Sequence, residues 1–157
     1  MTTLLTWVLL VPAGAAGQEQ PDPQLLAFIN TIKVVDHHSH ALPARSTLIQ
    51  KPNVHADVSG QTFFRSRHGL SETLRLWLWA FPEKIFFGTD AFMNSPLRGW
   101  EEMTLLPTRS GREALALALT HMTTAGDITR PRAEEVARMV LRDNAVKLYG
   151  LPPQTAK

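Results

Sequence analysis

Two histidines, His38 and His40, stand two positions apart at the end of an apolar run, a spacing that can hold a metal ion. Side chains on a β-strand repeat every two residues, so Asp36, His38 and His40 would face the same way on an extended backbone. Neutral imidazole nitrogens bind zinc at about 2.0–2.1 Å. The pattern therefore predicts that His38 and His40 bind a divalent metal ion, with zinc expected. The alternative is a histidine-rich turn that is exposed to solvent.

A carboxylate, Asp90, follows a second apolar run at residues 84–87 and the pair Gly88-Thr89. The carboxyl ends of parallel strands form the edge where α/β proteins place their chemistry. Asp90 is therefore predicted to ligate the metal ion and to act as a catalytic residue that accepts a proton from water acidified by that ion. The alternative is a structural Asp90 that caps a turn or the next helix.

Three residues in predicted loops are candidates for contacts with a substrate: His68, Arg98 and Trp100. Arg98 and Trp100 fall in the long segment 91–108, and loops of that length are usually functional or disordered. Arg98 could bind an acidic group, and Trp100 could form a flat apolar wall. A solvated arginine and a packing tryptophan are the alternatives. His68 falls in the predicted loop 59–69.

The remaining histidines are not expected to bind the metal ion. His55 stands at the beginning of a predicted strand, opposite the edge that Asp90 would occupy. His121 falls near the C-terminus of a predicted helix, where an imidazolium interacts favourably with the helix dipole. His37 would face away from His38 and His40, because neighbouring side chains on a strand point to opposite sides.

The hydrophobic pattern predicts helices that alternate with strands, which is typical of parallel α/β architecture. Asp22 and Ser71 are candidate N-caps, Ser110 and Glu113 match a capping box, and Gly150 stands where a left-handed C-terminal cap belongs. The predicted helices cover residues 23–30, 72–80, 110–122 and 129–149, and the predicted strands cover residues 31–36, 54–58 and 84–87.

The composition is that of an ordinary globular domain: 157 residues, 44% hydrophobic, with a formal net charge of +2. Basic residues are scattered among acidic ones, so nucleic acid is not an expected partner. The chain has no cysteine, which excludes disulfides, thiolate metal sites and a thiol nucleophile.

The first residues are typical of a secretory signal peptide. An apolar run at residues 4–11 precedes the small residues Ala13-Gly14-Ala15. Residues 1–17 are therefore expected to be an export leader, and the mature protein to be secreted or periplasmic; it would be cytoplasmic if the leader is not processed. The run is too short for a stable membrane anchor, so no membrane span is expected.

Three segments together resemble the amidohydrolase superfamily: Asp36-x-His38-x-His40, residues 84–90 and residues 144–151. The resemblance implies a (β/α)8 barrel in which His38 and His40 bind the metal ion and Asp90 is the catalytic aspartate. It also implies a small-molecule substrate with an amide, ester or lactone carbonyl that the protein hydrolyses. Metal-dependent decarboxylation, a lyase reaction, is the alternative chemistry on the same fold.

The chain departs from that family in length. A barrel of this type needs about 250 residues, whereas residues 22–151 supply three predicted strands. The expected fold class is therefore α/β, a single truncated domain that forms a partial (β/α)8, TIM-barrel-like fold with several central β/α units missing. A non-catalytic remnant is the alternative, and uncovered sheet edges could lead the chain to associate with itself.

Overall fold

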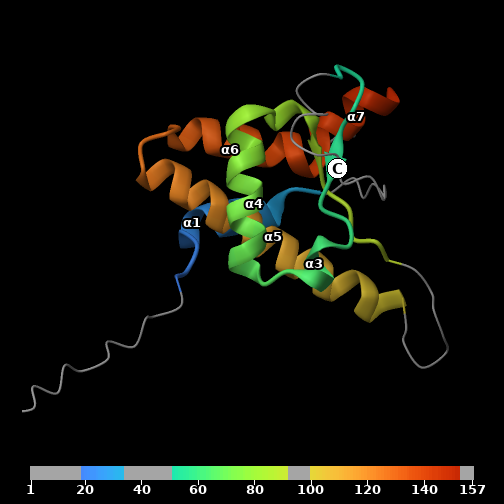
Figure 1. Ribbon diagram of the computed structural model, residues 1–157, viewed down its shortest axis with the longest axis horizontal. Helices are drawn as coiled ribbons and strands as arrows, with labels where there is room; N and C mark the ends of the chain where they lie inside the picture. The colour runs from blue at the N-terminus through green and yellow to red at the C-terminus, as the bar shows by residue number, and fades with distance from the viewer. Residues whose placement is uncertain (1–18, 34–50, 92–99, 153–157) are drawn as a thin grey trace, which may run out of the picture.

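The computed structural model describes residues 19–33, 51–91 and 100–152. His38, His40, Arg98 and the expected leader at residues 1–17 lie outside these ranges, as does the second half, residues 34–36, of the strand predicted at residues 31–36. The described residues form a mostly helical body with a two-stranded sheet (Figure 1). Its elements are α1 (Pro23–Thr31), β1 (Ala56–Asp57), α3 (Gln61–Phe64), α4 (Arg67–Ala80), β2 (Ile85–Phe86), α5 (Trp100–Thr124), α6 (Arg130–Arg138) and α7 (Asn144–Tyr149).

The two strands pair in parallel, Ala56 with Ile85 and Asp57 with Phe86, as the alternating pattern predicts. Parallel strands need a crossover connection, and here α3 and α4 supply it. A 3-10 turn (Pro82–Lys84) leads from α4 into β2. The parallel pairing of these two strands is confirmed, whereas the partial barrel remains a prediction.

The core forms where α4 packs on α5, the most extensive contact between any two elements (Figure 1). Residues 114–119 of α5 are at most 1% exposed, so this stretch of helix is buried all round. Leu74 and Leu78 of α4 are buried, and Trp77 packs against the core while Trp79 is 67% exposed. No helix in the described ranges is long and apolar enough to cross a membrane.

The last helical segment, predicted as one helix, contains a π-helical turn (Met139–Asp143) between α6 and α7. At this turn the Val140 carbonyl accepts a hydrogen bond from Phe87 N (3.0 Å). The Asn144 amide then donates to Pro82 O and Ile85 O, both at 2.8 Å. The edge of β2 that faces away from β1 is therefore occupied by this helical segment, and self-association is not expected there.

Helix α1 docks on α5 and α6 through its two ends. Asp22 caps it, because Asp22 Oδ1 accepts from Gln24 N (2.8 Å) and Leu25 N (2.9 Å). Asp22 Oδ2 also accepts from Arg130 (2.8 Å). At the other end Arg112 donates to the carbonyl oxygens of Ile29 and Ile32, and burial lowers the pKa of its guanidinium. The predicted cap and start of this helix are confirmed.

Asp22→Ala is expected to lower the free energy of unfolding by about 1 kcal/mol at pH 7, because the N-cap is lost. The pKa of Asp22 lies below its ordinary value, since the Leu25 N–H and the Arg130 guanidinium stabilise the charged carboxylate. A depressed folded-state pKa contributes stability above the unfolded-state value of about 3.9, and this contribution is lost as the pH falls through the folded-state value. Urea unfolding of both proteins should therefore show a difference that shrinks on acidification.

Asp22→Asn is the matched control, because asparagine also caps helices but lacks the charge. Its stability is expected to vary less with pH between neutrality and the acid range than that of the parent. A difference between Asp22→Ala and the parent that stays constant throughout the acid range would contradict this account.

The structure corrects three predicted boundaries. Residues 59–69 are not one loop, because α3 and the first turn of α4 lie there. The N-cap of α4 is Ser66, whose hydroxyl accepts from Gly69 N (3.1 Å), whereas Ser71 is buried inside the helix and donates to His68 O. Thr31, predicted to start a strand, is the last residue of α1.

The segment 91–108 is also not a loop throughout, since α5 begins at Trp100. The predicted capping box at Ser110 and Glu113 is therefore inside the helix and not at its start. Pro107 lies within α5 as well, although proline usually ends or kinks a helix. Glu101 and Glu102 occupy the first turn, where acidic side chains interact favourably with the helix dipole.

Candidate functional site

Asp90 lies where the sequence predicts it, just beyond the carboxyl end of β2. Its side chain is half-buried, and its backbone has a positive φ of 59°. No other non-glycine residue in the described ranges has a positive φ. Such a backbone costs about 1–3 kcal/mol and clusters at functional sites, although aspartate tolerates it better than most residues. Thr89 Oγ1 accepts from Ala91 N (3.2 Å) and helps to shape the turn.

Gly60 brings the carboxyl end of β1 against Asp90. A β-carbon built on Gly60 would lie 3.4 Å from Asp90 Oδ2 and 4.0 Å from Phe64 Cε2. The φ of Gly60 is 72°, in the region that favours glycine, and this residue is the N-cap of α3. The carboxylate of Asp90 therefore lies next to the start of α3, at van der Waals distance from the place that a β-carbon on residue 60 would occupy.

A second carboxylate, Asp57, lies on β1 and was not singled out by the sequence reasoning. It is 2% exposed, and its Oδ1 accepts from Ser59 N (2.9 Å). This bond forms a tight turn directly after the strand, which leads into Gly60. The signal in the sequence was the apolar neighbours of Asp57, since a carboxylate inside an apolar run is seldom buried without a structural or chemical role.

The other predicted members of the site lie outside the described ranges or are described in part. His38, His40 and Arg98 are in segments that the structure does not describe. Trp100 is the first residue of α5, and its side chain is likewise not described. The predicted metal-binding and substrate-binding roles of these residues therefore stay predictions, and of the three predicted metal ligands Asp90 is the one whose position is described.

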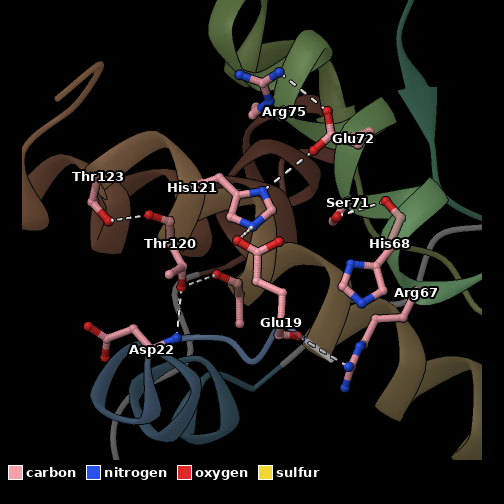
Figure 2. Close-up of polar contacts among 11 residues, drawn as sticks. Glu19, Asp22, Arg67, His68, Ser71, Glu72, Arg75, Thr120, His121 and Thr123 are labelled. Atoms are coloured by element: carbon pink, nitrogen blue, oxygen red, sulfur yellow. Dashed lines mark hydrogen bonds and ion pairs between the residues drawn. The ribbon is translucent and has the colours of Figure 1, made fainter. Parts of the chain in front are cut away.

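His121 belongs to a polar cluster on α4 and α5, together with Glu19 and Glu72 (Figure 2). Its Nε2 lies 2.7 Å from Glu19 Oε1, and its Nδ1 lies 3.5 Å from Glu72 Oε1. His121 is ten residues further along α5 than Gly111, which contacts Phe87, so about 15 Å of helix separates the two positions. This placement near the C-terminus of the helix agrees with the structural role predicted for His121.

His68 lies in the first turn of α4, and Figure 2 draws it with the same set of polar contacts. Its carbonyl oxygen accepts from Ser71 Oγ at 2.8 Å. The neighbouring Arg67 reaches Glu113 (3.5 Å) and the Glu19 carbonyl (3.4 Å). The role of His68 in substrate binding stays a prediction.

His55 lies directly before β1, at the opposite end of the sheet from Asp90, as predicted. Its ring packs edge-on against Phe86, with ring centroids 5.0 Å apart. It also lines a pocket of about 590 Å³ together with Glu83, Asn144 and Lys147. The hydrogen bonds by which Asn144 holds β2 lie at this end of the sheet, so the contacts of His55 there are structural.

Comparison with known proteins identifies the family of this chain. Residues 27–151 match the family model described as Amidohydrolase. The chain belongs to the amidohydrolase family. The match includes the second half of α1, both strands and the later described helices, and it contains His38, His40 and Asp90. Neither the curated proteins nor the solved structures gave a match to this chain.

Amidohydrolases generally bind divalent metal ions, so the donors around Asp90 decide how this chain could do so. Within residues 19–33, 51–91 and 100–152, no group of three or more His, Asp or Glu residues could hold a metal ion. A catalytic zinc site usually has three protein ligands and an open position. The described part therefore shows no complete metal site, and the roles of His38, His40 and Asp90 as metal ligands stay predictions.

Proposed function

We propose that this amidohydrolase is a metal-dependent hydrolase that cleaves an amide, ester or lactone carbonyl of a small molecule. The observation that carries the proposal is the place of Asp90, at the carboxyl end of the parallel strands with Oδ2 beside the bare Gly60 position. In α/β proteins this edge is where ligands bind and react. The left-handed backbone of Asp90 adds support, since strained positions cluster at functional sites.

In this proposal His38, His40 and Asp90 hold the ion, with zinc expected. A divalent ion supplies positive charge that polarises a carbonyl and lowers the pKa of water from about 15.7 toward 7. Asp90 accepts the proton of the attacking water and returns it to the leaving group, which is general acid–base catalysis by a positioned carboxylate. Arg98, Trp100 and His68 are the proposed substrate contacts, with Arg98 binding an acidic group.

The scaffold and location belong to the same proposal. Residues 22–151 would form one truncated domain, a partial (β/α)8 barrel that keeps the first and the last strands of the family fold. Residues 1–17 would be an export leader, so that the mature protein is secreted or periplasmic. The described helices and the parallel β1–β2 pair are compatible with such a fragment.

A non-catalytic remnant is the second candidate. It is favoured by the two-stranded sheet and by the lack of a complete metal site within the described ranges. Decarboxylation is the third, and it uses the same ligands on the same fold. Metal binding separates the first candidate from the remnant, and analysis of the products separates hydrolysis from decarboxylation, because only the latter releases carbon dioxide.

The decisive experiment is a zinc titration of the purified, metal-free chain by calorimetry. About one tightly bound ion per chain is expected, because three donors suffice for a catalytic site. His38→Ala and His40→Ala should each weaken binding by more than about 100-fold, since even the loss of outer-sphere partners costs about 10–100-fold.

His121→Ala is the matched control, because it also removes an imidazole but from the cluster on α4 and α5. Its zinc affinity should equal that of the parent. Absence of zinc binding by the parent, or affinity that survives the loss of both His38 and His40, would favour the non-catalytic remnant.

A further inference from the structure

His121 lies between two carboxylates that come from different segments of the chain (Figure 2). Its Nε2 lies 2.7 Å from Oε1 of Glu19, which precedes α1, and its Nδ1 lies 3.5 Å from Oε1 of Glu72, on α4. The side chain of His121 is 20% exposed, whereas those of the two glutamates are 60% and 53% exposed. The ring therefore joins the chain that enters α1 to the pair formed by α4 and α5, at a place that water reaches only in part.

The two ring nitrogens of His121 can donate to both carboxylates only when the ring is protonated. A neutral imidazole has one N–H donor and one acceptor nitrogen, and an ionised carboxylate only accepts. With a neutral ring, either Glu19 or Glu72 therefore faces a lone pair. An imidazolium can donate to both at once, and its place in the last turn of α5 also favours a positive charge.

The other charged groups near this ring do not replace it as a partner of Glu19. They are Asp22 before α1 and Arg67, His68 and Arg75 on α4 (Figure 2). Arg75 pairs with Glu72 (3.3 Å), and Arg67 pairs with Glu113 (3.5 Å), so each arginine has a carboxylate of its own. Histidine ordinarily titrates near pH 6.5 and aspartate and glutamate near pH 4, so around neutrality the charge of this set changes at its histidines.

Glu19 belongs to a short segment, residues 19–22, that α5 holds at two adjacent positions. Asp22 N donates to Thr120 Oγ1 (2.9 Å), and the Glu19 carboxylate contacts the neighbouring His121. The first attachment is a hydrogen bond between groups that do not titrate. The second depends on the charge of the ring, so the two ends of the segment respond differently to pH.

We propose that His121 makes the attachment of residues 19–22 sensitive to pH: protonation of the ring tightens its contact with Glu19, and deprotonation loosens it. Contacts that need the proton contribute stability below the range in which histidine titrates, and they lose it as the pH rises through that range. The segment is therefore held more firmly in mildly acidic solution and opens more often above neutrality. This inference does not depend on the proposed function, because it involves neither Asp90 nor a metal ion.

The test measures amide hydrogen exchange of Asp22 in the full chain by NMR, with each rate divided by the intrinsic rate at the same pH. Protection of Asp22 should be about twofold to fivefold higher near pH 5.5 than near pH 7.5, the range expected for a partly exposed ion pair. His121→Gln should remove this difference, because glutamine does not titrate. Glu19→Gln should remove it as well, since it keeps the ring but removes the charge that the ring faces.

His68→Gln is the matched control, because it also removes an imidazole from this region, and Figure 2 marks no ion pair at the His68 ring. It should keep the pH dependence of the parent. Equal protection of Asp22 at both pH values in the parent would overturn the inference. A pH dependence that persists in His121→Gln or in Glu19→Gln, or that is lost in His68→Gln, would overturn it too.

Discussion

Asp90→Asn is expected to lower kcat for hydrolysis by about 10²–10⁴-fold, the usual contribution of a positioned acid–base group. Asparagine has nearly the same shape but cannot accept the proton. It also tolerates a positive φ, so the backbone at φ 59° is kept. Hydrolysis of 4-nitrophenyl acetate by the zinc-loaded chain measures the rate, and urea unfolding of the same samples measures stability, which should stay close to that of the parent.

Asp127→Asn is the matched control, because it makes the same chemical change at an exposed aspartate between α5 and α6. Its kcat should equal that of the parent. Asp90→Gly separates strain from chemistry, since glycine adopts a positive φ without cost: it should be inactive and at least as stable as Asp90→Asn. Unchanged activity of Asp90→Asn would show that Asp90 is not the catalytic residue.

Asn144→Asp is expected to lower the free energy of unfolding by about 3 kcal/mol or more. Asn144 is 6% exposed and uses its amide to donate to two carbonyl oxygens, those of Pro82 and Ile85, each at 2.8 Å. An aspartate there would direct acceptor oxygens at acceptor oxygens, and a buried charge without a donor is strongly destabilising. Urea unfolding at neutral pH measures the loss.

Asn30→Asp is the control for Asn144→Asp, because Asn30 is exposed on α1. It should change stability by no more than about 0.5 kcal/mol, the usual range for surface substitutions. Asn144→Ala should lie between the two, since it removes both donors without adding an acceptor. Equal stability of Asn144→Asp and the parent would mean that these two hydrogen bonds do not hold β2.

Local signals predicted several elements well. Asp22 caps α1 as expected, because the cap depends on residues two and three positions away. Gly150 has the left-handed conformation expected after the last helix, with φ 60°. The strands predicted at residues 54–58 and 84–87 are the two paired strands, although each is shorter than predicted.

Local signals failed where tertiary packing outweighed them. Pro107 lies in the segment predicted as a loop, yet α5 continues through it because the helix is held by its long buried stretch at residues 114–119. Ser110 and Glu113 have the spacing of a cap but lie inside the same helix, since a capping pair is informative only at a helix start. Ser71 was predicted as the N-cap of α4, whereas the N-cap is Ser66, which comes earlier in the sequence.

For the site, the sequence by itself determined which residue types were available and that Asp90 follows a strand, because these depend on the order of residues and the period of their hydrophobicity. The tertiary structure alone decided that Gly60 and Phe64 lie beside Asp90 and that Asn144 of α7 holds β2. Contacts between residues 30 to 60 positions apart depend on how all the helices pack, and no local pattern encodes that packing.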